Sequence, residues 1–230
     1  RVSIIETGPA PQVCMAHLAT VGSHSINGVS KLHTELLQNR VFDRFQTLTP
    51  RTYEDVPVRI VDIDDETLSR LGQWPWPRKL VARLVSRLSK AGASTIVFDV
   101  VFSEPDRTSP RRIAASWPDG PEFAALKERV SKLPDHDVLL AKTFKAGRVV
   151  LGYTLITEHN DVRPAAKASF SYGGDGPLNY TIPFKGSVGN LPVLEAAVAG
   201  LGNVSVIPEP DFVIRNVALL SNLHGTLLPA

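Results

Sequence analysis

Residues 78–102 read RKLVARLVSRLSKAGASTIVFDVVF and decide the fold. In the first half of this stretch, apolar residues recur at the three- and four-residue spacing of one helix face, and basic residues fall on the opposite face. Gly92 provides a C-terminal stop, so the pattern predicts a helix over residues 78–91. Residues 96–102 form an almost unbroken apolar run, which is typical of a strand buried on both faces.

Residues 58–63 predict a further strand ahead of this helix, and strand, helix and strand in that order predict a right-handed parallel unit. Residues 121–130 and 135–147 predict helices, residues 149–151 a third core strand, and residues 204–207 and 212–214 a hairpin. Residues 103–120 and 157–190 are predicted to be irregular. The sequence therefore predicts an α/β fold of three layers, with a central, mainly parallel sheet and a C-terminal antiparallel hairpin.

Composition excludes several classes of protein. The chain has 25 basic and 23 acidic residues, and their net charge of +2 is too small for a nucleic-acid-binding protein. Its one cysteine, Cys14, excludes an internal disulfide and a cysteine-based zinc site. No apolar run approaches the ~20 residues of a spanning helix, and no signal peptide is visible. We therefore expect a soluble chain without a cofactor.

Six carboxylates lie in or just after the first two predicted strands: Asp62, Asp64, Asp65, Asp99, Glu104 and Asp106. Because the carboxyl ends of neighbouring parallel strands meet at one edge of a sheet, we expect these side chains to share a rim. Carboxylates that crowd together raise one another's pKa unless a cation or an arginine lies between them. The group is therefore a candidate site for a ligand or a cation.

Three interpretations of this acidic group remain open. The first is a site for a hard cation such as Mg²⁺ or Ca²⁺, although the metal is not identified. The second is the aspartate nucleophile of a haloacid-dehalogenase phosphatase at Asp62 and Asp64, but that motif needs threonine at the fifth position, where this chain has Glu66. The third is structural: the carboxylates cap helices and pair with Arg78 or Arg107. No catalytic residue is assigned.

A second distinctive motif is the turn Trp74-Pro75-Trp76-Pro77 followed by Arg78. The two prolines exclude a helix interior or a central strand, and Pro77 fits the first turn of the next helix. The tryptophan rings would serve either as a platform for a ligand or as a plug in the core. We favour the plug, because aromatic anchors flanked by prolines more often fill a core or a dimer interface.

The segments VDIDDETL (61–68), LGQWPWPR (71–78) and FDVVFSEPD (98–106) strongly resemble the CHASE type-2 family, the second class of cyclase- and histidine-kinase-associated sensory extracellular domains. A weaker likeness continues at Gly202-Asn203-Val204, Pro210-Asp211 and Arg215, with Phe212 where the family usually has glycine. The resemblance covers residues 39–230.

This resemblance implies a sensory domain and not an enzyme. It would lie on the periplasmic or extracellular face of the bacterial inner membrane and pass signals to adenylate cyclase, histidine kinase, diguanylate cyclase or Ser/Thr kinase modules. The expected partner is a small-molecule or protein stimulus that the sequence does not identify, and a homodimer is left open. Contact with a membrane is expected only through spans that this chain does not contain.

The segments RVSIIE (1–6), MAHL (15–18), VGSH (21–24), NGV (27–29) and LHTE (32–35) resemble the glycogen phosphorylase family. The resemblance implies that residues 1–38 are a fragment of a larger enzyme and not an independent domain, with His17 belonging near that enzyme's active site. The pyridoxal phosphate lysine and its motif are absent from the chain. We therefore expect a fusion whose first 38 residues are separable from the fold and do not catalyse a reaction.

Overall fold

The computed structural model describes residues 5–6, 12–13, 44, 47–50, 52, 54–174, 176–207, 214 and 217–230. The chain divides into two compact units, Arg1–Asp62 and Ile63–Ala230. In the first unit, strands β1 (Ile5–Glu6) and β2 (Gln12–Val13) pair antiparallel. The resemblance to phosphorylase, including His17, falls mainly on residues outside the described part. The boundary at residue 38 therefore stays a prediction.

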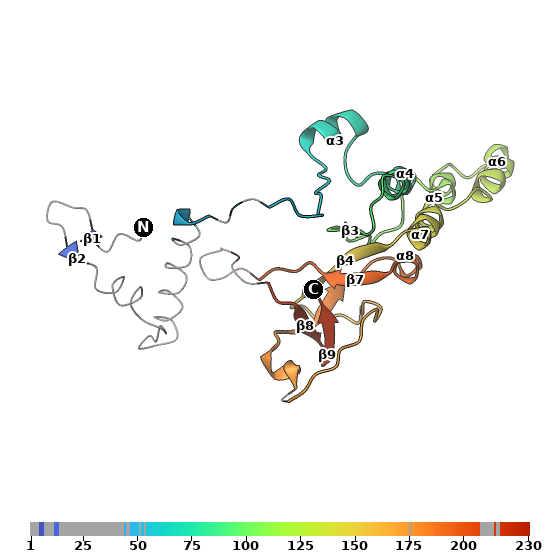
Figure 1. The fold of residues 1–230 in the computed structure, drawn as a ribbon. Helices are drawn as coiled ribbons and strands as arrows, with labels where there is room; N and C mark the ends of the chain where they lie inside the picture. Colours follow the sequence, from blue (N-terminus) through green and yellow to red (C-terminus); the bar gives the residue numbers. More distant parts are fainter. Residues whose placement is uncertain are drawn as a thin grey trace. The chain divides into compact units, whose positions relative to one another are not determined.

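The second unit begins with helices α3 and α4 (Figure 1). Helix α3 (Asp65–Leu71) ends at Gly72, whose φ of 94° lies in the left-handed region that glycine adopts without steric cost. Helix α4 (Arg78–Lys90) matches the predicted helix to within one residue at its C-terminal end. It buries Val81 and Val85 on the face that the apolar spacing indicates.

Strand β4 (Val149–Ile156) lies at the centre of the main sheet. It pairs parallel with β3 (Ile96–Phe98) and β7 (Gly200–Asn203), and antiparallel with β6 (Gly186–Val188). A smaller sheet consists of β5 (Pro183–Phe184), β8 (Leu220–Leu223) and β9 (Thr226–Pro229). The α/β class is confirmed, with sheets that mix parallel and antiparallel strands.

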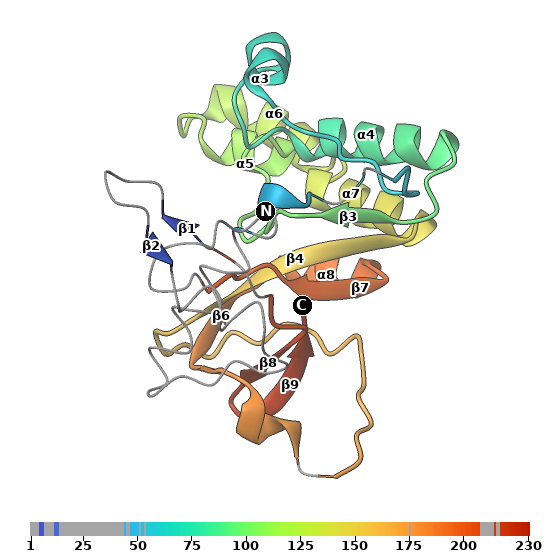
Figure 2. The same ribbon diagram turned by 60° about the vertical axis from the view of Figure 1, so that its left-hand side comes forward.

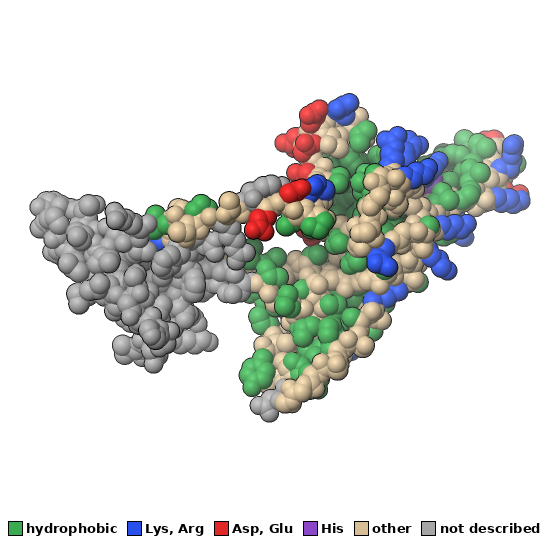
Figure 3. Space-filling model, in the orientation of Figure 1, with side chains coloured by type: hydrophobic (Ala, Val, Ile, Leu, Met, Phe, Trp, Pro, Cys, Tyr) green, Lys and Arg blue, Asp and Glu red, His purple; other side chains and the backbone are tan. Residues whose placement is uncertain are grey.

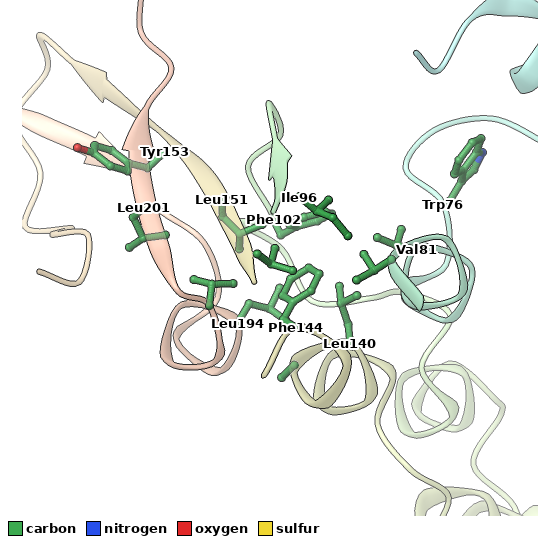
Figure 4. Packing of buried hydrophobic residues seen from close by; sticks show 14 of the residues in the cluster. Trp76, Val81, Ile96, Phe102, Leu140, Phe144, Leu151, Tyr153, Leu194 and Leu201 are labelled. Carbon is green, nitrogen blue, oxygen red and sulfur yellow. The ribbon is translucent and has the colours of Figure 1, made fainter. Parts of the chain in front are cut away.

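Helices α4, α7 (His136–Ala146) and α8 (Pro192–Ala197) lie on one face of the main sheet (Figure 2). Figure 4 shows how side chains from these helices, among them Leu140, Phe144 and Leu194, meet Leu151 of β4 in the core. The remaining helical elements are α5 (Pro110–Ala115), α6 (Pro121–Ser131) and the short 3₁₀ helix η1 (Pro177–Tyr180). Helix α5 lies within the stretch 103–120 that was predicted to be irregular.

The prediction requires strand β3 to be buried on both faces, but the face that points away from the helices is exposed. Ile96 and Phe98 point toward the helices, whereas Val97 between them is 70% exposed. Strand β3 pairs only with β4 among the described residues, and residues 99–102 continue without strand structure. The prediction of a strand buried on both faces over 96–102 is therefore wrong, and the predicted three-layer arrangement is not confirmed.

The strand predicted over residues 58–63 is also absent. Within the described residues this segment has no ladder partner, and Val58, Ile60 and Val61 are exposed by 67%, 92% and 56%. A strand is defined by pairing with another strand, which an apolar pattern alone cannot supply. The prediction is wrong for this reason.

The C-terminal hairpin exists but at a different place. Residues 204–207 have no strand structure and instead follow β7 alongside β4, where Val204 N–H donates to the carbonyl of Tyr153 at 2.9 Å. Residues 212 and 213 lie outside the described part. The observed hairpin joins β8 to β9 through His224 and Gly225, whose φ angles of 49° and 81° suit a two-residue turn.

The Trp-Pro turn packs its second tryptophan into the core. Trp76 is 5% exposed, and its indole N–H donates to the carbonyl of Gly72 at 2.8 Å. The ring of Trp74 lies edge-on to that of Trp76, with centroids 5.7 Å apart, and packs partly buried against the core. The burial of Trp76, with its one polar atom hydrogen-bonded, is what a core plug requires.

We expect Trp76→Ala to lower the free energy of unfolding by about 3–5 kcal/mol, the range for removing a buried aromatic ring. Chemical denaturation of the full chain measures this change. The control is Tyr180→Ala, which removes a 78% exposed ring and should change stability by less than about 0.5 kcal/mol. If the two variants were equally stable, Trp76 would not be a structural plug.

Candidate functional site

Asp64 caps the N-terminus of helix α3, and the acidic residues that follow it lie in the first turn. The Asp64 carboxylate accepts hydrogen bonds from the Thr67 N–H at 2.8 Å and the Thr67 hydroxyl at 2.5 Å. These two bonds, the hydroxyl's first, lower the pKa of Asp64 below its ordinary value. Asp65 lies exposed in the first turn, where a negative charge favours the helix, and Asp62 belongs to the other compact unit.

The carboxylates after β3 have different surroundings from one another. Asp99 and Glu104 are exposed, and it is the backbone carbonyl of Glu104 that accepts a hydrogen bond, from Arg78 Nη2 at 2.9 Å. Asp106, by contrast, is 5% exposed, and both of its carboxylate oxygens have hydrogen-bond partners. The structure therefore separates the predicted group into solvent-facing and buried members.

Asp106 accepts hydrogen bonds at both oxygens. Its Oδ2 receives the Arg78 N–H at 2.8 Å and lies 3.1 Å from His136 Nδ1, and its Oδ1 receives the N–H and hydroxyl of Thr108, each at 2.8 Å. Burial by itself would raise the pKa of Asp106, but these bonds, led by those from the Thr108 and Arg78 amides, outweigh it and lower the pKa.

The buried partner of Arg78 is Asp137. Arg78 Nε lies 3.2 Å from Asp137 Oδ1, and the side chains are only 7% and 6% exposed. Asp137 Oδ2 also accepts the Asp106 N–H at 2.9 Å, and the Arg78 guanidinium carbon lies 4.5 Å from the centre of the Phe102 ring. We call Arg78, Asp106, His136 and Asp137 the polar cluster. It joins the start of α4, the loop after β3 and the start of α7.

The geometry of the polar cluster does not suit nucleophilic catalysis. The Asp106 carboxylate and the Thr108 hydroxyl both approach the same imidazole nitrogen, His136 Nδ1, at 3.1 and 3.4 Å. A catalytic triad needs the carboxylate on one ring nitrogen and the hydroxyl on the other. Ser109 is fully buried, and its hydroxyl accepts the His136 backbone N–H at 3.0 Å. The arrangement instead fixes the ends of three elements.

The structure does not gather the acidic side chains into a metal site. Across the described ranges, no three or more His, Cys, Asp or Glu side chains lie together in a way that could hold a metal ion. The groove beside α3, of about 370 Å³, is lined only by residues of that helix and its cap, Asp64 among them. A cation or ligand site at these carboxylates therefore stays a prediction.

A second buried network was not found from the sequence. Asn190 Oδ1 accepts the Phe102 N–H at 2.7 Å, and its amide nitrogen donates to the Gly152 carbonyl at 2.8 Å. The Glu195 carboxylate accepts the N–H groups of Asn190 and Ala165, each at 3.0 Å. These bonds fasten Ala165 and α8 to the centre of the sheet. Beneath the adjoining residues 164–168 lies a cavity of about 60 Å³, well below the roughly 300 Å³ at which small-molecule pockets begin.

We expect Arg78→Met to cost about 3–5 kcal/mol of folding free energy, because it leaves the Asp137 carboxylate buried without its counter-ion. In the double variant Arg78→Met/Asp137→Leu, the loss should be smaller than the sum of the two single losses. Arg70→Met is the control: its pair with Glu66 has both side chains 75% exposed and should contribute about 0–1 kcal/mol. Additive losses in urea denaturation would contradict a coupled buried pair.

The lowered pKa of Asp106 predicts acid sensitivity. The stability that it contributes is present above the ordinary value of 3.8 and is lost as the pH falls through the lower folded-state value. Thermal unfolding followed from neutral pH to below pH 3.8 should therefore show a shallower loss for Asp106→Asn than for the parent chain. Asp161→Asn removes the same charge from an exposed loop and controls for net charge. Parallel curves for the parent and Asp106→Asn would contradict the prediction.

Comparison with known proteins gives two different likenesses. The model of the CHASE2 domain family matches residues 15–230. A short match joins the chain to glycogen phosphorylases: the brain forms of Rattus norvegicus and Homo sapiens are 40% identical over 55 residues, and the muscle form of Ovis aries is 38% identical over 55 residues. This match covers 24% of the chain but only 7% of the rat enzyme and 6% of each of the other two.

The phosphorylase-like match therefore corresponds to a small piece of those enzymes. Because it is 55 residues long and the CHASE2 match begins at residue 15, the two matches share part of the chain. No solved structure matches the chain. None of the helices in the described part is long and apolar enough to span a membrane. Because the family model covers most of the chain, this protein belongs to the CHASE2 domain family of sensory, non-catalytic extracellular domains.

Proposed function

We propose that this chain is the ligand-sensing domain of a bacterial transmembrane receptor, displayed on the outer face of the inner membrane. In this proposal residues 39–230 form the sensor and pass a signal to a cyclase, histidine kinase or diguanylate cyclase module. The observation that carries it is the match of the CHASE2 family model to residues 15–230.

The interior of the second unit supports a sensing role over a catalytic one. The buried carboxylates of Asp106 and Asp137 are taken up by internal donors, so neither is free to act on a substrate. Asp99 and Glu104 are exposed on the same loop and are the members of the acidic group that we propose face the stimulus. Binding residues are often carried by exposed loops that a rigid scaffold positions.

The phosphorylase-like segment does not add an activity in this proposal. The matched phosphorylases are far longer, since the chain spans only 6–7% of their length. We propose that residues 1–38 are a fused, non-catalytic fragment. The alternative of a metal-dependent phosphatase at Asp62 and Asp64 has less support, because Thr67 occupies the Asp64 carboxylate and Glu66 stands where the phosphatase motif needs threonine.

The proposal can be tested in a chimera that carries the full chain between two transmembrane helices, ahead of an adenylate cyclase, in a bacterial host. Cys14 is the only cysteine, so Cys14→Ser/Ser131→Cys places one thiol at an exposed position on α6. We expect a membrane-impermeant maleimide to label this thiol in intact cells. A compound that raises the melting temperature of the isolated chain should also change the cyclic AMP level.

A cysteine placed in the cyclase module is the control and should label only after lysis. Labelling of Ser131→Cys only after lysis would contradict an outward-facing sensor, and stabilising compounds without any effect on the cyclase would contradict a coupled one. Turnover of a phosphate ester with Mg²⁺ that Asp64→Asn abolishes would favour the phosphatase instead.

A further inference from the structure

Charge is distributed unevenly along the chain. Residues 78–148 contain 14 lysines and arginines but eight aspartates and glutamates, although the whole chain has a net charge of only +2. Figure 3 shows blue side chains over the helices of this range and red ones gathered around α3. The near-neutral total thus conceals a basic helical surface on the second unit.

The most regular part of this surface is one face of α4. Lys79, Arg83, Arg87 and Lys90 follow one another at spacings of four, four and three residues, so they form a single row along the helix. All four are exposed, and the row lies opposite Val81 and Val85, which face the core. At 1.5 Å per residue the row is about 16 Å long. We call these four residues the basic row.

The basic row has no counter-charges in the part of the chain that the structure describes: its four side chains enter none of the ion pairs found there. Other basic residues of the same helical region do, since Arg78 pairs with Asp137, Lys127 with Asp119 and Lys132 with Glu128. Like charges four residues apart repel one another along a helix, although Arg87 and Lys90, in the last turn of α4, also interact favourably with the helix dipole. Among the described residues, no ion pair offsets the repulsion along the row.

The neighbouring helix extends the basic surface. Helix α7 packs against α4, and its Lys142 and Lys145 are exposed. No aromatic side chain is exposed on α4, so this face lacks the stacking platforms typical of single-stranded nucleic-acid binding. Helix α4 also has no exposed large apolar side chain that could insert into a bilayer, and α7 has only Val138, which is 42% exposed. A partner must therefore be anionic, extended and held mainly by charge.

We propose that the basic row of α4 binds a surface of anionic phospholipid headgroups. The choice of lipid rests on the proposed function, which puts the domain beside a bacterial inner membrane, where phospholipid headgroups form an extended anionic surface. Lys and Arg side chains near an anionic bilayer each contribute about a fivefold gain in affinity. The inference uses only the proposed location of the domain and does not depend on the stimulus or on the output module.

The test measures sedimentation of the full chain with phosphatidylcholine vesicles that contain or lack phosphatidylglycerol. We expect binding only to the anionic vesicles, and its loss at about 1 M salt, where the Debye length is only about 3 Å. Arg83→Gln/Arg87→Gln/Lys90→Gln should weaken binding about 100-fold, at about fivefold for each charge removed. Glutamine keeps a good helix propensity, and the melting temperature verifies that this variant folds.

Arg163→Gln/Lys167→Gln/Lys185→Gln is the matched control, because it removes the same charge from exposed positions outside the helical surface. We expect it to bind within about threefold of the parent chain, less than the effect of one basic-row charge. Equal losses in the two triple variants would show that only net charge matters and would overturn the proposal. Failure of the parent chain to bind anionic vesicles, or tighter binding to an oligonucleotide than to those vesicles, would also overturn it.

Lys142→Gln/Lys145→Gln gives a second measurement, on the adjoining helix α7. We expect this variant to bind anionic vesicles about 25-fold more weakly than the parent chain.

Discussion

The guanidinium of Arg78 enters the interior of the second unit only because the Asp137 carboxylate is there to receive it. A charge without a counter-ion costs several kcal/mol to bury, so neither residue could be inside alone. The planar guanidinium also donates to the Glu104 carbonyl, and the Arg78 backbone N–H donates to Asp106. Because the donor directions of a guanidinium are fixed, the Arg78 side chain sets the position of α4 relative to α7 and to the loop after β3. The Trp-Pro turn immediately before it is held in place as a consequence.

Helical elements of the second unit could be predicted from the sequence because their signals are local. The apolar spacing and Gly92 predict α4, and Pro121, Asp135 and Gly147 lie at the ends of the next two predicted helices. Strand pairing is not local. Residues 58–63 and 149–151 are both rich in the apolar residues that favour strands, yet only the latter have strand partners among the described residues. The hairpin of β8 and β9 was missed because its turn, His224-Gly225, is not among the common hairpin sequences.

The candidate site could be predicted only in part for a related reason. Arg78, Asp64 and Asp106 stand out in the sequence, and two of the roles that the structure gives them, helix capping and burial with an arginine, belong to the structural interpretation. The buried partner of Arg78 does not stand out, because Asp137 is 59 residues away in the sequence. The same is true of the second buried network, in which Asn190 bonds Phe102 across 88 residues. An aspartate two residues after the helix-capping Asp135 looks like an ordinary first-turn carboxylate, and nothing local indicates that it is buried.

Strand β4 links the two parts of the second unit that these networks hold. Its first residues pair with β3 and β7 under the helices, and residues 154–156 pair with β6, next to the segment 160–165 that Asn160 and Glu195 fasten. The strand has eight residues, or about 26 Å of nearly inextensible backbone. A push on its outer end cannot be absorbed by stretching. A displacement of that end is therefore passed along the backbone to the residues that lie beneath the helices, so the two ends of β4 are mechanically coupled.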